Sequence, residues 1–319
     1  MSSRRLQPLE TWFARHCGDR PFGCLVVEHG KVAGEWYGGG FGPDSLFEIG
    51  SIRKSFNSAL IGIGIARGDV DLHQKACAVW PELVEISGDQ RDEAVTLHQL
   101  ASGTSGWLTA DPPGAVFRYN NAAFTAAERV VARLYHLPDD ETAGEVARRF
   151  KGPLGADSWQ IYHFDRRFDA NDIDDPGPKL AVDSNVADLV KWGELWLQRG
   201  VWNSQRLIPP AHVDCATRLA NPGLKDAWYG YSWFVNADRV LWPAAPEGSY
   251  GHPGFGSFKP SEEVSRAYLW ICPAFRVVAA MVTDVTVGIA SDYLDIPNGV
   301  TAAWIAAIAR SLDWRPAAG

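Results

Sequence analysis

The chain has 319 residues, of which 46% are hydrophobic and 21% are charged, an ordinary composition for a globular protein with a full core. Its length fits one large domain or two interleaved lobes. The net charge of −8 argues against nucleic acid or an anionic membrane surface as a partner, because both require a basic face. No apolar run approaches the roughly 20 residues of a membrane span.

The N-terminus and the cysteines indicate where the protein works. The opening segment MSSRRLQPLETWFARHC has two arginines but no apolar stretch behind them, so it does not resemble a secretory signal. The five cysteines are scattered, and none has the CxxC or Cys/His spacing typical of zinc sites. We therefore expect a cytoplasmic protein with reduced thiols, no metal and no cofactor.

The first elements along the chain are a hairpin and a helix. Residues 22–38 predict the hairpin, because the β-branched run PFGCLVVEH is followed by a turn at HGK and by the alternating return VAGEWY. Residues 51–67 predict a helix with apolar residues along one side and Gly68 as its stop.

The middle of the chain, residues 70–215, looks mainly helical. Its apolar periodicity predicts helices near 122–135, 141–150 and 184–199. Asp183-Ser184 is the expected N-cap of the third helix, whose sequence is VADLVKWGELWLQRG.

The last third of the chain returns to strand. The segments YGYSWFV, RAYLWICPA and RVVAAMVTD are aromatic and β-branched, and the last two predict a hairpin around Pro273. An amphipathic helix follows in VTAAWIAAIARSL. Strands at both ends with helices between them predict an α/β (α+β) fold, in which residues 1–70 and 216–319 form a sheet lobe and residues 71–215 a mainly helical lobe. We expect the functional cleft between the two lobes.

The strongest candidate for chemistry is Ser51-Ile52-Arg53-Lys54, at the start of the first long helix. A helix places residues i and i+3 on one face, so the Ser51 hydroxyl and the Lys54 amine can meet. Serine is a weak nucleophile that needs a base within reach, and lysine serves as one when desolvation or a second cation lowers its pKa. By itself the tetrapeptide is more typical of a helix-capping serine followed by a surface lysine.

Two further motifs carry polar groups suited to the same chemistry. Tyr119-Asn120-Asn121, in PPGAVFRYNNAAF, offers a phenol that can relay a proton and an amide that can hold both the lysine and a substrate carbonyl. In His252-Pro253-Gly254, within SYGHPGFGSF, glycines on an edge strand would let the backbone approach a ligand. The first of these motifs alone also fits a capping asparagine with a half-buried tyrosine. The second is the weaker signal, because His16-Cys17-Gly18 matches the same H-x-G pattern.

S-x-x-K, Y-x-N and [KH]-x-G in this order resemble the serine β-lactamase and penicillin-binding family, most closely its class C branch with its esterases and 6-aminohexanoate-dimer hydrolases. FEIGSIRKSFNSALIGIGIARGDVDL resembles the nucleophile helix of that family, VTLHQLASGTSGW its T-S-G signature, and GHPGFG its G-H-x-G-x-G segment. The likeness covers about residues 24 to 285. It implies a β-lactamase-like fold, an antiparallel sheet flanked by helices with an inserted helical lobe.

The resemblance also implies catalytic roles for three residues. Ser51 would be acylated by the substrate carbonyl, and Lys54 would share the proton network of Ser51. Tyr119 would act as the base for Ser51 and later as the acid for the leaving group.

The remaining implied roles concern substrate binding. Asn121 would steady Lys54 and the substrate, and the N–H groups of Ser51 and Phe255, next to Gly254, would form the oxyanion hole. His252 would flank the pocket, and Trp107 is a further candidate for its substrate-binding wall.

The sequence departs from the family pattern in two places. Only residues 107–112 separate Thr104-Ser105-Gly106 from Pro113-Gly114, where many relatives carry a longer segment, so we expect a cleft that is more open or is covered from elsewhere. The third motif starts with His252 rather than lysine, which removes a fixed positive charge and favours neutral substrates. The aspartate-rich segment 165–175 does not match a calcium loop and predicts a solvated loop.

We therefore expect a serine hydrolase that cleaves carboxylic esters or small amides through an acyl-enzyme on Ser51. A β-lactamase or a D-amino-acid peptidase is the alternative reaction. A non-catalytic β-lactam sensor or scaffold is the alternative of another class. The expected partner is a small molecule rather than nucleic acid or membrane, and the sequence leaves the oligomeric state open.

Overall fold

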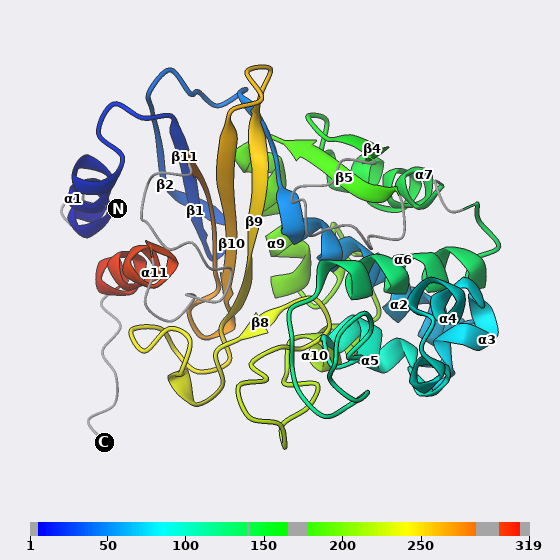
Figure 1. Cartoon of the computed structure of the whole chain (residues 1–319). Helices are drawn as coiled ribbons and strands as arrows, with labels where there is room; N and C mark the ends of the chain where they lie inside the picture. The colour runs from blue at the N-terminus through cyan, green and yellow to red at the C-terminus, as the bar shows by residue number, and fades with distance from the viewer. Residues whose placement is uncertain (1–5, 139–140, 165–177, 285–299, 313–319) are drawn as a thin grey trace.

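Figure 1 shows a computed structural model of the chain, in which residues 6–138, 141–164, 178–284 and 300–312 are described. Its main sheet has nine strands in the order β2-β1-β11-β10-β9-β3-β5-β4, with β8 beside β9, and all its pairings are antiparallel. A separate two-stranded sheet joins β6 and β7. The strands are β1 (Phe22–Glu28), β2 (Lys31–Gly38), β3 (Leu46–Glu48), β4 (Gln160–Phe164), β5 (Lys179–Ser184), β6 (Val201–Trp202), β7 (Gln205–Arg206), β8 (Phe234–Val235), β9 (Tyr250–Lys259), β10 (Val264–Cys272) and β11 (Val277–Asp284).

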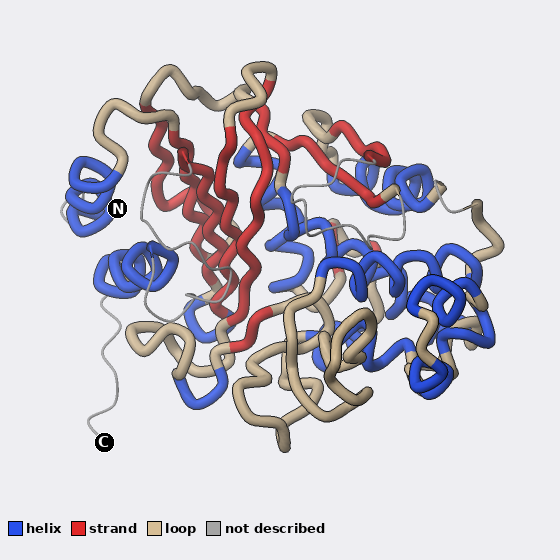
Figure 2. The backbone as a smooth tube through the Cα atoms, in the orientation of Figure 1, coloured by secondary structure: helices blue, strands red, loops and turns tan. Residues whose placement is uncertain are grey.

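Some helices cover the faces of the sheet, and others form a helical region beside it (Figures 1 and 2). Helices α1 and α11 pack on each other and lie to one side of the sheet, whereas α9 packs on β11, β10 and β1. Helices α2 to α6 gather on the far side of β9. The helices are α1 (Gln7–His16), α2 (Lys54–Arg67), α3 (Ala76–Val79), α4 (Glu82–Ser87), α5 (Leu97–Ser102), α6 (Asn121–Leu134), α7 (Thr142–Val146), α8 (Gly152–Leu154), α9 (Val186–Leu197), α10 (Pro210–Ala216) and α11 (Val300–Ser311).

Strand β1 is buried along its whole length because both of its faces are covered. Side chains alternate between the two faces of a strand. Val26 accordingly belongs to a core cluster with Trp12 of α1 and Trp304 of α11. Its neighbour Leu25 belongs to the other cluster, with Leu189 of α9. This double burial explains why the sequence of β1 reads as a continuous apolar run rather than as an alternation.

The elements expected from local sequence patterns are largely present. The hairpin predicted over 22–38 is confirmed, since β1 and β2 pair from Phe22–Gly38 to Glu28–Lys31. The first long helix ends at Gly68, which takes the left-handed conformation that glycine favours. The N-cap predicted at Asp183-Ser184 is wrong, because both residues complete β5 and the side chain of Asn185 caps α9.

Part of the segment 71–215 lies with the sheet rather than with the helices. β5 pairs with β3 and β4 pairs with β5, so the sheet extends past β9 into this segment. Helix α9, from the same segment, packs on β11. These contacts join residues far apart in the chain, and the local composition of the segment carries no signal for them.

Strand β9 lies inside the sheet, yet one of its edges is open over a short stretch. On one side it pairs continuously with β10, from Tyr250–Ile271 to Ser257–Val264. On the other side it pairs only with β8 at its start and with β3 at its end. The edge between these two pairings belongs to residues 252–257, which were expected on an edge strand. The segment that contains Ser51 lies against this edge, as described below.

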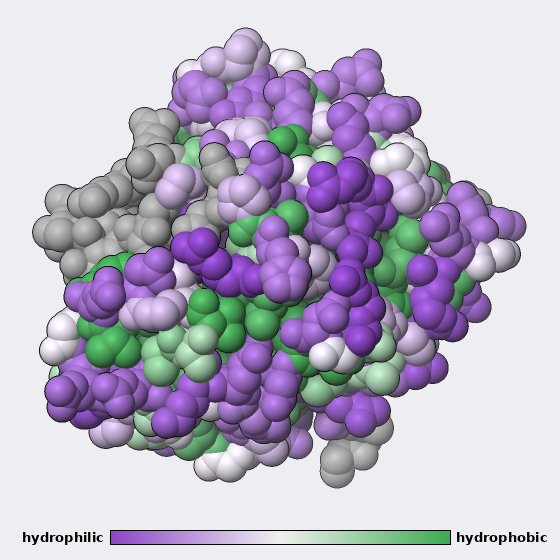
Figure 3. All heavy atoms as spheres, turned by 90° about the vertical axis from the view of Figure 1, so that its right-hand side faces the viewer, coloured by the Kyte–Doolittle hydropathy of each residue, from purple (hydrophilic) through white to green (hydrophobic). Residues whose placement is uncertain are grey.

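The surface carries no extended run of exposed large apolar side chains among the described residues. Those that are exposed come from separate parts of the chain, namely Val32, Ile65, Ile86, Val116, Val240 and Val264. Figure 3 shows one face, on which apolar residues emerge between hydrophilic ones. Within the described ranges, no helix combines the length and the hydropathy needed to cross a membrane.

Candidate active site

Ser51 lies on a tight turn between the sheet and the first long helix. A 3₁₀ turn, Gly50–Arg53, precedes α2, and both Ser51 and Lys54 are buried. The turn is held to β5 through the Ile49 N–H, which donates to the Val182 carbonyl at 3.0 Å. The predicted helical spacing of Ser51 and Lys54 is therefore realised across the junction of a 3₁₀ turn and an α-helix.

Lys54 joins the first two motifs. Its Nζ donates to Ser51 Oγ at 2.7 Å and to Asn121 Oδ1 at 3.0 Å. Asn121 is the first residue of α6, and the side chain of Asn120 caps that helix by accepting from the Ala123 N–H. The cap fixes the start of α6, so a local feature of the Y-N-N motif directs an amide at an amine 67 residues away.

Tyr119 presents its ring to the same amine. Lys54 Nζ lies 4.9 Å from the centroid of the Tyr119 ring. That ring stacks on Phe234 of β8, with centroids 5.8 Å apart, and lies 6.0 Å from the rings of Tyr229 and His252. An aromatic enclosure on this scale lowers the local dielectric and strengthens the interactions between the charged and polar groups at Lys54.

The backbone of β9 passes directly against the turn Gly50–Arg53. A Cβ placed on Gly254 would lie 2.0 Å from the Ile49 carbonyl oxygen and 3.1 Å from Ser51 N. Gly50 has a φ of +56°, and a Cβ there would lie 2.0 Å from the Phe255 carbonyl oxygen. Both positions therefore require glycine. The close approach brings the backbone at Phe255 beside that at Ser51, the two N–H groups expected to form an oxyanion hole.

His252 is buried behind Tyr119, with 2% of its surface exposed. Its Nδ1 contacts the Pro253 carbonyl, which can only accept, so Nδ1 carries the proton and Nε2 accepts from the Tyr229 hydroxyl at 3.1 Å. Burial and the nearby Lys54 charge lower the His252 pKa to about 3. The ring is neutral at physiological pH.

Two residues that none of the three motifs contains, Tyr229 and Glu128, also support the site. Tyr229 lies in the YGYSWFV segment and holds His252. Glu128, a buried carboxylate on α6, accepts from Arg53 Nη1 at 3.1 Å and from the Leu180 N–H at 2.9 Å. Its only sequence signal is a charge within the apolar stretch AAFTAAERVV.

Glu128 remains ionised although it is buried. Desolvation alone would raise its pKa, but the contact with His163 and the charge of Arg53 outweigh it and lower the pKa to about 2. Glu128 also accepts from the Thr142 hydroxyl at 3.0 Å. Arg53, two residues after Ser51, is therefore paired with a buried carboxylate.

Trp107 is not a cleft residue. Its side chain is fully buried, and its Nε1 donates to the Leu83 carbonyl at 2.9 Å. Only its backbone serves the site, because the Trp107 carbonyl accepts from Asn120 Nδ2 at 2.7 Å. The expectation that Trp107 lines the substrate wall is corrected: a large apolar ring gains more from the core beside Trp80 than from an exposed wall.

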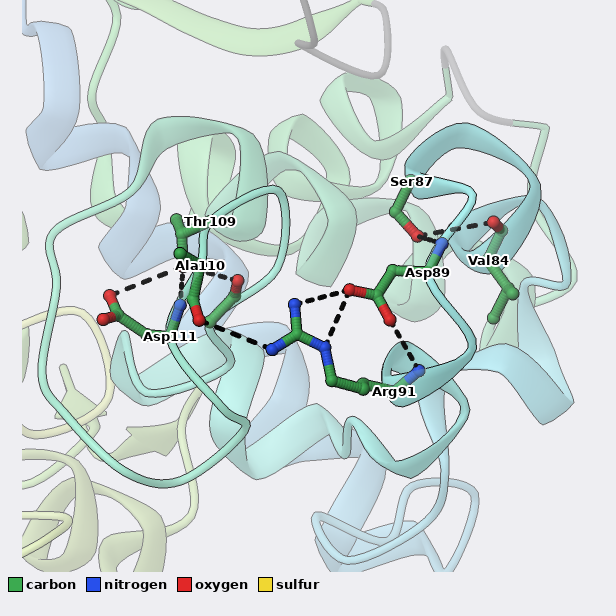
Figure 4. A network of polar contacts seen from close by, with 8 residues as sticks. Val84, Ser87, Asp89, Arg91, Thr109, Ala110 and Asp111 are labelled. Atoms are coloured by element: carbon green, nitrogen blue, oxygen red, sulfur yellow. Dashed lines mark hydrogen bonds and ion pairs between the residues drawn. The ribbon is translucent and has the colours of Figure 1, made fainter.

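The short segment after Gly106 is a compact turn tied to its surroundings. The Thr109 N–H donates to the Gly106 carbonyl at 2.9 Å, and the Thr109 hydroxyl donates to the same carbonyl at 2.6 Å. Arg91, bound to Asp89, reaches the Ala110 carbonyl at 3.4 Å (Figure 4). The side chain of Arg91 thus links the segment around Asp89 to the short segment after Gly106.

The described residues contain no group of three or more His, Cys, Asp or Glu side chains that could hold a metal ion. The aspartates expected in a solvated loop lie between 165 and 175, outside the described residues.

The model of the family described as Beta-lactamase matches residues 23–302. Among curated proteins, a β-lactamase of Escherichia coli (strain K12) is 38% identical over 72 residues, which cover 23% of this chain and 18% of that protein. Penicillin-binding protein 4 of Amycolatopsis lactamdurans is 23% identical over 294 residues, covering 76% of this chain and 72% of that protein.

Solved structures share the fold at low sequence identity. A Bacillus anthracis protein, provisionally described as a 6-aminohexanoate-dimer hydrolase, has a TM-score of 0.67 at 17% identity, covering 96% of this chain and 82% of its own. A penicillin-binding protein homologue of Caulobacter crescentus has a TM-score of 0.66 at 16% identity, covering 88% and 91%. Together with the family match over most of its length, these likenesses lead to one conclusion: the chain belongs to the Beta-lactamase family, whose members are typically serine hydrolases.

Proposed function

We propose that the protein hydrolyses carboxylic esters or small amides through an acyl-enzyme on Ser51. The observation that carries the proposal is the convergence on Lys54 Nζ, which lies 2.7 Å from Ser51 Oγ and 3.0 Å from Asn121 Oδ1 and faces the Tyr119 ring. A serine activated by neighbouring proton acceptors is the arrangement that nucleophilic catalysis requires.

In the proposed acylation, Tyr119 and Lys54 together take the proton of Ser51 as its Oγ bonds to the substrate carbonyl carbon. The N–H groups of Ser51 and Phe255 hold the oxyanion. The bond to the leaving oxygen or nitrogen then breaks, and Tyr119 returns the proton to that atom. Asn121 keeps Lys54 in place and orients the substrate carbonyl.

Deacylation repeats the same proton transfers with water as the nucleophile. Water attacks the acyl carbon and gives a proton to the Tyr119–Lys54 pair, and the bond between Ser51 Oγ and the acyl group breaks. Ser51 regains its proton as the carboxylic acid leaves. The cycle consumes one water and needs no further reactant.

The preferred substrates are neutral. His252 is buried and its pKa is lowered to about 3, so it offers no positive charge to a substrate carboxylate. Arg53 is paired with Glu128. A lost charge-assisted hydrogen bond is worth roughly 1.5 to 3 kcal/mol, or about 10- to 150-fold in rate for an anionic substrate.

The test compares kcat/KM for p-nitrophenyl butyrate, a linear amide, a D-peptide and nitrocefin at pH 7.5. We expect the ester or the amide to exceed nitrocefin by at least about tenfold. A nitrocefin value equal to or above the ester value would contradict the substrate assignment and favour the β-lactamase alternative, and hydrolysis of the D-peptide alone would favour the peptidase.

A second test separates an enzyme from a binding scaffold. Wild-type protein should take up one fluorophosphonate per chain, and Ser51→Ala should lose both labelling and turnover while keeping its melting temperature. Intact-mass measurement and peptide mapping give the readout. Labelling of another serine in the Ser51→Ala variant would show that the nucleophile is misassigned, and an unlabelled wild-type protein would favour the scaffold.

A further inference from the structure

A small buried cavity adjoins Lys54. Its volume is about 10 Å³, and five of its lining residues are polar: Arg53, Lys54, Asn57, Glu128 and Ser232. The other lining residues are apolar and come from α5 and α6. The cavity therefore places a polar space next to the amine that contacts Ser51.

Asn57 is the unexplained member of this group. It lies on α2, three residues after Lys54 and thus on the same side of the helix, and it is 8% exposed. Its Oδ1 is buried, and no hydrogen-bond partner for it occurs among the described parts of the chain. A buried amide oxygen without a partner costs about 1 to 3 kcal/mol, and asparagine is also a poor helix former. An apolar residue would be more stable at this position unless the oxygen has a use.

We propose that the cavity holds one ordered water molecule, which donates to Asn57 Oδ1 and bridges it to Lys54. A cavity of about 10 to 15 Å³ is the smallest that accommodates a water, and such a water needs two to four polar partners. The five polar lining residues offer enough hydrogen-bonding groups to meet that requirement.

The bridge makes Asn57 a positioning residue for Lys54. Asn57 does not touch substrate; it acts through the water on the amine that contacts Ser51 Oγ and Asn121 Oδ1. By accepting from Lys54, the water also stabilises the charged form of the amine beside Ser51 and Tyr119. This catalytic role rests on the proposed function, whereas the water site itself does not.

Three variants at one position test the inference, with p-nitrophenyl butyrate as substrate and kcat/KM measured from pH 5 to 10. Asn57→Asp adds negative charge beside Lys54 and should raise the apparent pKa of the profile by about 1 unit, whichever member of the coupled group loses the proton. Asn57→Leu removes the acceptor and fills the space, so the pKa should fall and kcat/KM should drop on the order of tenfold. Asn57→Ser keeps a hydroxyl and room for water, and should retain the wild-type profile.

Ser58→Ala is the matched control. Ser58 is also buried on α2, but it contacts His212 at 3.1 Å and does not line the cavity. Its loss should lower the melting temperature without shifting the pH profile. If the Asn57 variants behave like this control, with stability changed and the profile unmoved, the positioning role is overturned.

A crystal structure of the wild-type protein tests the water directly. Density for one water within hydrogen-bond distance of Asn57 Oδ1 supports the proposal, and an empty or collapsed cavity overturns it. This readout needs no activity, so it remains decisive if the protein proves not to be a hydrolase. Conversely, an active enzyme with an empty cavity leaves the proposed function intact and removes only the water bridge.

Discussion

Lys54 contacts three groups from two segments of the chain: Ser51 on the preceding turn, and Asn121 and the ring of Tyr119 at the start of α6. The amine is buried, so each contact acts in a medium of lower dielectric than water. Contacts of this kind can hold the lysine and pass protons, and both Lys54 and Tyr119 are candidates to remove the serine proton. The hydroxyl of Tyr119 decides between the two, because it can be removed without changing the ring.

Tyr119→Phe should lower kcat by on the order of 10²-fold or more, the usual contribution of a general acid or base. KM should change little, because the ring keeps its packing on Phe234. Steady-state kinetics with an ester substrate measures the effect. Tyr135→Phe is the control, since the Tyr135 hydroxyl donates only to the Leu60 carbonyl, at 2.6 Å, and its removal should affect stability alone. A Tyr119→Phe variant with near-wild-type kcat would show that Lys54 manages the protons alone.

At the scale of elements, the site depends on how closely β9 approaches the turn Gly50–Arg53. The approach is possible because the edge of β9 opposite β10 has no paired strand along 252–257 and because Gly254 has no side chain. Two backbone segments in such contact can present adjacent N–H groups to one oxygen atom, which side chains rarely achieve with the same precision. Gly254 of the third motif thus allows the two backbone segments to approach closely and contributes no reacting side chain.

Gly254→Ala should push β9 away from the turn Gly50–Arg53, because the Cβ of the alanine would lie 2.0 Å from the Ile49 carbonyl oxygen. We expect a loss of kcat/KM of about 10²-fold and a loss of stability of about 1 to 3 kcal/mol. Gly42→Ala is the matched control, since a Cβ there meets nothing within 4 Å. Kinetics and urea unfolding of both variants test the claim, and equal activity of the two would contradict the close-approach model of the oxyanion hole.

At the scale of the whole molecule, buried titratable groups link stability to pH. Burial lowers the pKa of His212 to about 4 and is the main cause that lowers the pKa of His252 to about 3. As pH falls below about 6.5, the unfolded chain binds protons that these folded residues do not, so each histidine costs stability down to its folded pKa. Burial raises the pKa of Glu48 to about 7, which acts in the opposite sense between pH 4.5 and 7.

Glu48 offsets one of the two histidines, so unfolding takes up about one net proton between pH 6 and 5. The free energy of unfolding should therefore fall by about 1.4 kcal/mol per pH unit in this range because of these three groups. His212→Gln should remove about that slope, whereas Glu48→Gln should steepen the fall by a similar amount. Urea unfolding at pH 5, 5.5 and 6 provides the measurement. Parallel curves for the wild type and His212→Gln would show that His212 titrates normally in the folded state.

Much of the site could be anticipated from short segments of sequence. The spacing of Ser51 and Lys54, the turn of Tyr119-Asn120-Asn121 and the glycines around His252 are local, and local geometry follows from a few neighbouring residues. The hairpin over 22–38 and the stop at Gly68 are local for the same reason. The order of the three motifs along the chain was sufficient to recognise the family, which the comparisons confirm.

What the sequence could not predict depends on contacts between distant segments. A tryptophan at position 107 is compatible with both a cleft wall and the core, and only the contact with Trp80 in the folded protein places it in the core. The charge of Glu128 became informative only when folding brought Arg53 and the Leu180 N–H to it. His252 reads in the sequence as a group that titrates near pH 6.5, and burial beside Lys54 makes it neutral over the whole physiological range. The sequence by itself determined which residue types are present and their local spacing, whereas burial, charge state and the open edge of β9 were decided by the tertiary structure, because each depends on atoms that are remote in the chain.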